Sequence, residues 1–224
     1  MLCRWGINAV YCFLMRSKSL KRAIDIIGSL VALLLFLPIL IVAGIALYIE
    51  SGTPIFYVDK RVGRNRKTFG FFKLRTMIPN AEEYLLKHNP QLLEEYIKNG
   101  YKLSLKNDPR ITKVGRILRR FDIDEMPQFV NVLLGDMSLV GPRAYKPYEI
   151  EEQESKHPWS KEYIDISHSV KPGITGLWQT SGRSRLGYET RIKMDAQYAK
   201  EWTVLKDIYY LIKTPIAVLK SHGD

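Results

Sequence analysis

The longest hydrophobic pattern of the chain lies near its start and reads "IIGSLVALLLFLPILIVAGIALYI", from residue 26 to residue 49. It contains no charged residue, and about 20 apolar residues suffice for a helix to cross a bilayer. A signal peptide is a poor interpretation because the run begins late, is long, and has no small-residue cleavage site before a polar mature start. The pattern therefore predicts a membrane-inserted helix.

Basic residues flank this run on both sides, at positions 16 to 22 and 60 to 67. Positive flanks favour the cytoplasmic side, and one straight span cannot place both of them there. Pro38 lacks a backbone N–H and clashes with the preceding turn, so it can kink or break the helix. Two interpretations stay open: a re-entrant segment that turns at Leu37–Pro38 and returns to the same face, and a kinked single span.

Shorter patterns follow the apolar run, and they predict an α/β fold that is mostly helical with short β segments. The last helix ends in "DIYYLIKTPIAVLK", a composition typical of an interfacial helix, with a core helix as the alternative. We expect strands within residues 53–77, helices at 80–99 (divided at Pro90), shortly before residue 120, at 127–134 and at 188–220, and loops over 141–187.

These patterns divide the chain into three parts. Residues 1–20 are an interfacial or truncated segment, residues 21–52 form the membrane helix, and residues 53–224 form one domain, which the re-entrant path places on the cytoplasmic side. With the re-entrant path, the predicted fold is membrane-associated and monotopic, meaning that its proline-broken helix enters the membrane from one side only.

Composition narrows the possible partners. The 224 residues carry a net charge of +11, which favours anionic lipid, phosphorylated substrates or nucleic acid. No nucleic-acid-reading motif accompanies the charge, so we expect no nucleic-acid partner. The two cysteines and four scattered histidines match neither a disulfide framework nor a zinc motif.

The candidate chemistry lies in "RRFDIDEMPQF", where Asp124 and Glu125 stand side by side. Pro127 is favoured in the first turn of a helix, which places both acids at or just before a helix N-terminus. Acids in such places are common as simple caps. One ionised and one perturbed carboxylate is also a recurring way to divide the roles of nucleophile and acid or base.

Basic residues in short motifs favour the chemical interpretation over the capping one. Cations that converge on two acids suit a phosphoryl site, where the charge on phosphate oxygens must be neutralised. Mg²⁺ would assist there, held by a carboxylate and by substrate phosphates. The cations concerned are Lys73, Arg75, Arg119, Arg143 and Arg183.

Four ordered motifs resemble the bacterial sugar transferases, that is the monotopic phosphoglycosyl transferases. They are "KRAIDIIGSLVALLLFLP", "KRVGRNRKTFGFFKLRTM", "LRRFDIDEMPQFVNVLLGDMSLVGPR" and "VKPGITGLWQTSGR". The match runs from about residue 19 to the end of the chain. The matched part of the chain is similar to the catalytic part of the long family members. Those members carry an extra N-terminal membrane domain, which is expected here to be missing or reduced to residues 1–20.

The resemblance implies a membrane enzyme of the bacterial inner membrane, with its catalytic domain facing the cytoplasm. Such enzymes transfer a hexose-1-phosphate from a UDP-sugar to undecaprenyl phosphate with Mg²⁺ and release UMP, which starts exopolysaccharide or O-antigen assembly. The sugar expected here is galactose or glucose. Membrane lipid is an expected partner, and a homodimer is the oligomeric state considered.

The resemblance also assigns roles to single residues. Asp124 becomes the nucleophile that carries a phosphosugar and the metal ligand, with Glu125 beside it as the second catalytic acid. Two positions depart from the family pattern: Leu37 stands where the family often has serine, and Ala144 stands at the third position of the Pro-Arg-Pro motif, in place of proline. The residues expected to bind substrate are Lys73, Arg75, Arg119, Pro142, Arg143, Arg183 and Asp195.

Two other functions remain open at this point. A non-catalytic membrane-surface protein that binds anionic lipid accounts for the charge and the apolar run, although it gives the ordered motifs no role. A metal-dependent glycosyl transferase would use similar acids, but it would release UDP in place of UMP.

Overall fold

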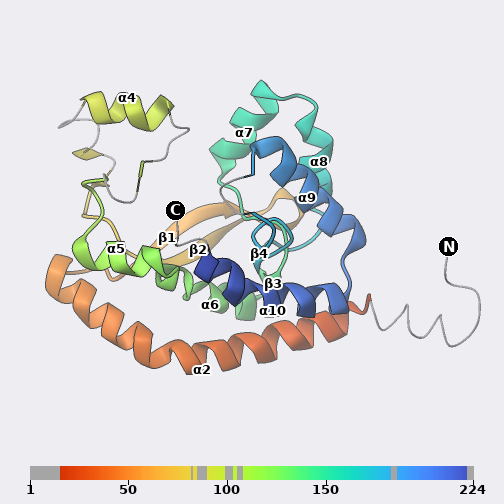
Figure 1. Cartoon of the computed structure of the whole chain (residues 1–224), viewed down its shortest axis with the longest axis horizontal. Coiled ribbons are helices and arrows are strands. Elements are labelled where there is room, and N and C mark those ends of the chain that lie inside the picture. The colour runs from red at the N-terminus through yellow and green to blue at the C-terminus, as the bar shows by residue number, and fades with distance from the viewer. Residues whose placement is uncertain are drawn as a thin grey trace, which may run out of the picture. The chain divides into compact units, whose positions relative to one another are not determined.

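The computed structural model describes residues 16–81, 83–84, 90–98, 103–104, 108–182 and 186–220. Helices predominate and the strands are short, which confirms that part of the predicted fold class. In order, the elements are α2 (Lys18–Ser51), β1 (Phe56–Val62), η1 (Arg64–Arg66), β2 (Thr68–Leu74), α4 (Pro90–Lys98), α5 (Lys113–Arg120), η2 (Ile123–Glu125), α6 (Gln128–Leu134), β3 (Ser138–Val140), α7 (Pro147–Lys156), α8 (Ser160–Ser167), β4 (Gly173–Thr175), α9 (Tyr188–Glu201) and α10 (Val204–Lys220), shown in Figure 1.

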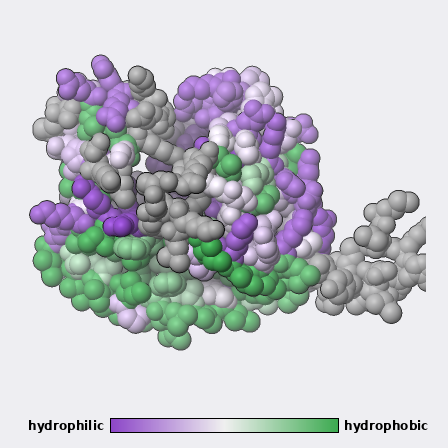
Figure 2. All heavy atoms as spheres, in the orientation of Figure 1, coloured by the Kyte–Doolittle hydropathy of each residue, from purple (hydrophilic) through white to green (hydrophobic). Residues whose placement is uncertain are grey.

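Helix α2 contains the whole apolar run and continues through Pro38 without interruption. Its 34 residues correspond to about 51 Å at the usual helical rise, more than the roughly 30 Å of a hydrocarbon core. It is the one helix of the described chain that is long and apolar enough to cross a membrane, and only 11% of its most apolar window is buried. Its exposed apolar side chains are green in Figure 2. This exposed apolar surface is compatible with association with a membrane, and the re-entrant path stays a prediction.

The chain forms two compact units, which we name after one helix each. The α5 unit contains residues 35–57 and 72–127, and the α9 unit contains residues 58–71, 128–220 and the beginning of α2. The core of the α5 unit joins the second half of α2 to β2 and α5, with Leu47, Leu74 and Leu118 at its centre.

The α9 unit is built around strands β3 and β4, and it contains the helices α6, α7, α8, α9 and α10. β3 pairs in parallel with β4, with Ser138 opposite Gly173 and Val140 opposite Thr175. A parallel pair needs a long crossover connection, and α7 and α8 supply it. α8 packs along α9, while α10 lies against both strands (Figure 1). Val132, Met137 and Tyr198 belong to the main core of this unit.

The strands at 56–74, the helices at 128–134 and 188–220, and the short helix before residue 120 confirm the sequence predictions. The loop predicted over 141–187 is wrong for residues 147–167, which form α7 and α8. Pro147 occupies the first turn of α7, and the buried Ile150 and Ile164 pack with Ile192 of α9. The prolines and glycines of this region suggested loops, so the two helices were not predicted. The stability of these helices comes from this tertiary packing.

Candidate active site

The acidic pair follows α5, and α5 is held firmly at its own start. Thr112 accepts a hydrogen bond from the backbone N–H of Gly115 at 2.9 Å and so caps the helix. Glu50, at the end of α2, accepts from the backbone N–H groups of Lys113 at 2.7 Å and Val114 at 2.9 Å. A Cβ at Gly115 would lie 2.2 Å from the carbonyl oxygen of Thr76, so only glycine permits this close approach.

These contacts at the start of α5 also fix the position of Arg119 and of the turn that follows it. Nε of Arg119 donates to the hydroxyl of Thr76 at 2.7 Å, and Leu118 on the neighbouring position is buried in the core. The chain then reverses at Asp122, whose φ of 54° is left-handed. Aspartate tolerates this conformation better than most residues. The turn leads directly into η2, which carries Asp124 and Glu125 just before α6 begins, as the sequence predicted.

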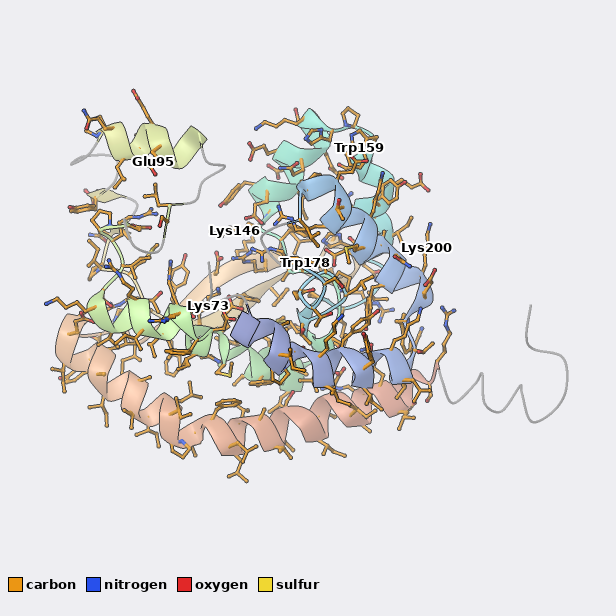
Figure 3. All side chains as sticks on the ribbon, viewed as in Figure 1. Lys73, Glu95, Lys146, Trp159, Trp178 and Lys200 are labelled. Atoms are coloured by element: carbon orange, nitrogen blue, oxygen red, sulfur yellow. The ribbon has the colours of Figure 1, made fainter. Side chains whose placement is uncertain are left out.

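Lys73 comes from β2 and meets the acidic pair. Its Nζ atom lies 2.6 Å from Oε1 of Glu125, with both side chains partly exposed; Lys73 is labelled in Figure 3. Strand β2 and η2 therefore bring together one lysine and two acids that are far apart in the sequence. The predicted association of Lys73 and Arg119 with the acidic pair is present within the α5 unit.

Asp124 has an unusual electrostatic environment. It is 5% exposed, and no residue in the described ranges donates a hydrogen bond to its carboxylate. Burial raises the pKa of Asp124 to about 6; the positive charges of Lys73 and Arg119 lower it, and the negative charge of Glu125 raises it further. The carboxylate is thus mostly ionised at neutral pH, yet more basic than an ordinary aspartate.

Arg75 is placed differently from the other predicted residues. Its Nη2 atom donates to the carbonyl oxygens of Ser51 at 2.7 Å and Gly52 at 2.9 Å, which are orphan acceptors at the end of α2. The side chain is buried, so this geometry favours a structural role in ending the helix. A role for Arg75 in substrate binding stays a prediction.

A magnesium ion fits this site only with help from the substrate. The described part of the chain has no group of three or more His, Cys, Asp or Glu residues that could hold a metal. Mg²⁺ is usually bound by one or two carboxylates, together with waters and substrate phosphates. Asp124 and Glu125 match that donor set, and a phosphate group would complete it.

A second cluster lies in the α9 unit, in the connection after β3. Asp195 of α9 is 1% exposed and accepts two hydrogen bonds, from the backbone N–H of Arg143 at 3.3 Å and from the hydroxyl of Tyr145 at 3.2 Å. Burial raises the pKa of Asp195 to about 7, although these hydrogen bonds and the nearby guanidinium groups lower it. Arg143 and Asp195, both predicted to bind substrate, are thus in contact, and Asp195 holds the Arg143 backbone.

Two guanidinium groups of this cluster lie near the ring of Trp178. The guanidinium carbons of Arg143 and Arg191 lie 5.7 Å and 5.6 Å from the centroid of its ring; Trp178 is labelled in Figure 3. Within the described ranges, the buried Nε1 of Trp178 and Nε of Arg191 have no hydrogen-bond partner. Sequence reasoning missed Tyr145, Trp178 and Arg191, although "RAYK" and "GLWQT" flank the predicted positions.

Pro142 shapes the loop that carries Arg143. Its carbonyl oxygen accepts from the backbone N–H of Gly173 at 2.8 Å, and a Cβ at Gly141 would lie 2.5 Å from the carbonyl oxygen of Lys171. The "GPR" and "KPGITG" motifs are therefore interlocked backbone to backbone. Arg183, the remaining predicted residue, lies outside the described residues.

Sequence reasoning also missed a buried ion pair near Arg119. Nε and Nη2 of Arg110 donate to the two carboxylate oxygens of Asp108 at 2.9 Å and 2.8 Å. Burial alone would raise the pKa of Asp108, but the hydrogen bonds from Arg110 outweigh it and the pKa is lowered. The "NDPR" motif places an acid and a base two positions apart, and this spacing was the signal.

Comparison with known proteins identifies relatives over almost the whole chain. The family model described as "Bacterial sugar transferase" matches residues 16–221. An "Uncharacterized sugar transferase" of Haemophilus influenzae is 42% identical over 210 residues, which cover 92% of this chain and 42% of that protein. The "Undecaprenyl-phosphate galactose phosphotransferase" of Salmonella typhimurium is 41% identical over 210 residues, with the same coverage of both chains.

A shorter relative matches along most of its own length. The "Exopolysaccharide production protein ExoY" of Rhizobium meliloti is 37% identical over 207 residues, which cover 91% of this chain and 87% of that protein. The chain therefore spans less than half of the first two relatives and most of the third. The shared part includes both clusters described above.

Proposed function

Because the chain belongs to the bacterial sugar transferase family, we propose that it transfers a sugar-1-phosphate from a UDP-sugar to undecaprenyl phosphate and releases UMP. The acceptor is suggested by the name of the Salmonella relative, and the same name makes galactose the first hexose to test, with glucose second. The product would begin assembly of an exopolysaccharide or a related glycan.

The observation that carries this proposal is the buried, basic carboxylate of Asp124. In the first step, an Asp124 oxygen attacks the phosphorus atom that bears the sugar. A new bond forms between aspartate and phosphorus, the bond from this phosphorus to the bridging oxygen breaks, and UMP leaves with that oxygen. A pKa of about 6 keeps the carboxylate ionised at neutral pH while leaving it more nucleophilic than an ordinary aspartate.

In the second step, a phosphate oxygen of undecaprenyl phosphate attacks the same phosphorus atom. The bond to Asp124 breaks, the carboxylate is regenerated, and the polyprenyl diphosphate sugar leaves. A covalent intermediate lets a water-soluble donor and a bilayer-confined acceptor use one carboxylate in turn. The phosphate group of the acceptor is negatively charged, so the nearby cations are needed to balance charge in this step as well.

The other residues of the α5 unit support this carboxylate. Lys73 and Arg119 lower the pKa of Asp124 and supply positive charge beside a reacting phosphate. Glu125 holds the Lys73 amine at 2.6 Å and so fixes that charge next to the nucleophile. Bound Mg²⁺, held by Asp124 or Glu125, would neutralise charge on the diphosphate oxygens. The binding role of Arg143 stays a prediction of the family resemblance.

The product nucleotide tests the proposal against its rivals. Purified chain with Mg²⁺, undecaprenyl phosphate and UDP-galactose or UDP-glucose should release UMP. Release of UDP would indicate transfer of the sugar alone, and no release with any of a panel of UDP-sugars would favour a lipid-binding protein. Omitting the acceptor should leave a protein heavier by one phosphosugar at Asp124, and added undecaprenyl phosphate should discharge it.

We also propose that α2 is re-entrant in the inner membrane and that the rest of the chain faces the cytoplasm. Support comes from the exposed apolar surface of α2 and from basic residues on both of its flanks. Single cysteines that replace Lys18 and Asn65 should both react with a membrane-impermeant thiol reagent only after the cell is opened, in a background without Cys3 and Cys12. Labelling of either position in intact cells would contradict this path.

A further inference from the structure

A cavity of about 230 Å³ lies in the α9 unit, where α2 begins. It is smaller than the usual pocket for a drug-sized ligand, and it has room for one small polar group and several waters. The walls come from the first two turns of α2, η1, the segment before β4 and the chain between α9 and α10. The residues that matter here are Lys18, Lys21, Arg22, Arg64, Lys171 and Trp202.

The positive charges of this cavity are only partly compensated. Lys21 is neutralised by Asp207, with Nζ 2.5 Å from Oδ2. The Nη atoms of Arg22 donate to the carbonyl oxygens of Val132 at 2.5 Å and Leu133 at 2.8 Å. Those bonds use two of the five N–H donors of a guanidinium group and leave the charge of Arg22 without an acid in the described chain.

Three further cations have no salt-bridge partner in the described chain, namely Lys18, Arg64 and Lys171. Asp25 is the acid in the cavity wall, and its Oδ1 atom already accepts from the hydroxyl of Ser138 and the backbone N–H of Leu139. Positive charge therefore dominates the cavity. Solvated rim lysines are common on protein surfaces, so the half-buried cation matters more than the two exposed ones.

Lys171 is that half-buried cation, and it lies close to Arg22. A Cβ at Gly135 would be 3.4 Å from Nζ of Lys171 and 3.8 Å from Nη2 of Arg22, so both groups surround the same point. Burial, followed by repulsion from Arg22, lowers the pKa of Lys171, although Asp25 and Asp136 partly oppose this. An anion placed between the two groups would relieve that repulsion and restore the preference for the charged amine.

The residues around the cavity are of the kinds found at the lipid-headgroup level of a membrane. Within the same unit, α2 exposes Ile27, Leu30 and Leu34 beyond its first turns, and α10 exposes Ile212 and Ile216. Trp202 lies in the cavity wall with Nζ of Lys21 5.7 Å from its ring centroid. Tryptophan and basic side chains gather where an apolar surface meets the aqueous phase of a membrane.

We propose that this cavity binds a phosphate group, with Arg22, Arg64 and Lys171 as its main donors. The inference does not depend on the proposed catalytic reaction. The phosphate can belong to a membrane phospholipid or to a soluble phosphate, and the chemistry of recognition is the same for both. Its position beside an exposed apolar surface favours the lipid, whose acyl chains would lie along α2 and α10.

The test uses the full chain in uncharged detergent and follows tryptophan fluorescence. Short-chain phosphatidylglycerol is compared with diacylglycerol of the same chain length, which lacks the phosphate, and inorganic phosphate with chloride at equal ionic strength. The Trp202→Phe variant identifies the signal that comes from the cavity. Arg64→Gln with Lys171→Gln removes two donors without removing a salt bridge of the described chain, and Lys60→Gln with Lys161→Gln is the control of equal charge change.

The cavity variant should bind the phosphate-bearing ligand at least about tenfold more weakly, which corresponds to about 1.4 kcal/mol, because two hydrogen-bond donors to a charged group are lost. The control should change by less than about twofold. A saturable response to phosphatidylglycerol identifies lipid, and a response to inorganic phosphate identifies a soluble ligand. Equal responses to diacylglycerol and phosphatidylglycerol, no response to either phosphate, or equal affinities of the two variants would overturn the proposal.

Discussion

Two buried aspartates, one in each unit, illustrate how differently burial can be used. Asp124 is 5% exposed and Asp195 is 1% exposed, and burial raises the pKa of both, to about 6 and about 7. The carboxylate of Asp195 accepts hydrogen bonds on both oxygens, from Tyr145 and from the Arg143 backbone. No residue of the described chain donates a hydrogen bond to Asp124, whose neighbours Lys73 and Arg119 act on it through charge.

Under the proposed mechanism, this difference separates a reactive carboxylate, Asp124, from a supporting one, Asp195. Lone pairs that already accept hydrogen bonds are poorly available for attack, so Asp195 is suited to hold the Arg143 loop in place. Asp124 keeps its lone pairs and has cations nearby to balance a phosphate. A perturbed pKa therefore marks both sites, while the hydrogen-bond partners distinguish their roles.

The largest expected effect concerns Asp124, the proposed nucleophile. Asp124→Asn keeps the shape of the side chain and removes the attacking charge, so UMP release should fall by at least about 10³-fold, to background. Asp195→Asn is the matched change at the other buried aspartate, and it should retain measurable turnover. Rates should be measured at saturating UDP-sugar, with circular dichroism to confirm that both variants are folded.

The comparison of the two aspartates fails if Asp124→Asn turns over at a near-normal rate. It also fails if Asp195→Asn acquires no phosphosugar label while Asp124→Asn does, because the roles would then be reversed. Equal loss in both variants, with both folded, would show that hydrogen bonding does not separate the two roles.

The next effect concerns stability and belongs to Asp195. Its folded pKa of about 7 lies above the ordinary aspartate value, so the native state takes up the proton first and stability rises as pH falls from above 7 towards about 4. Between pH 7 and pH 5 the change should be about 2 kcal/mol. In Asp195→Asn this contribution is absent.

Denaturant unfolding of the wild type and of Asp195→Asn at pH 5, 6, 7 and 8 measures that contribution. As pH falls, the free energy of unfolding of the wild type should increase relative to that of the variant. Asp124 contributes equally to both proteins, so its contribution cancels in this difference. A constant difference across this pH range would mean that Asp195 has the same pKa in the folded and unfolded states.

A destabilisation of comparable size is expected from Tyr145→Phe. The change removes the hydroxyl that donates to Oδ2 of Asp195 at 3.2 Å and leaves a buried acceptor without that partner. A loss of about 1–3 kcal/mol in the free energy of unfolding follows, measured at pH 8, where Asp195 is charged. An unchanged free energy of unfolding would show that this hydrogen bond contributes nothing to holding the loop.

The sequence predicted much of the local structure and the members of the acidic site, because both depend on short-range signals. The apolar run predicted α2, and Pro127 with Gly135 bounded α6 correctly. The packing of α7 and α8 against α9 depends on residues distant in sequence, so that stretch was interpreted as loop. No local pattern shows that the guanidinium group of Arg75, which was predicted to bind substrate, also binds the carbonyl oxygens at the end of α2.

The first turns of α2 give a similar lesson. Lys21 and Arg22 were interpreted only as positive flanks, whereas Lys21 pairs with Asp207 and Arg22 binds the carbonyl oxygens at the end of α6. Asp25 stands directly before the uncharged run, and its contact with Ser138 lies 113 residues away in the sequence. Such long-range partners are set by tertiary packing, which composition and periodicity do not encode.

The smallest expected effect is a pair of opposite shifts in the pH dependence of the reaction. Lys73 lowers the pKa of Asp124, so Lys73→Gln should raise it above about 6 and move the acidic limb of kcat/KM to higher pH. Glu125 raises the pKa of Asp124, so Glu125→Gln should lower it and move the same limb to lower pH. Each shift should be about one pH unit, because it arises from one neighbouring charge. The change of sign matters more than the size, since loss of substrate binding would lower kcat/KM at every pH without moving the limb. If both variants shift in the same direction, the group that titrates is not Asp124, and the nucleophile must be sought elsewhere.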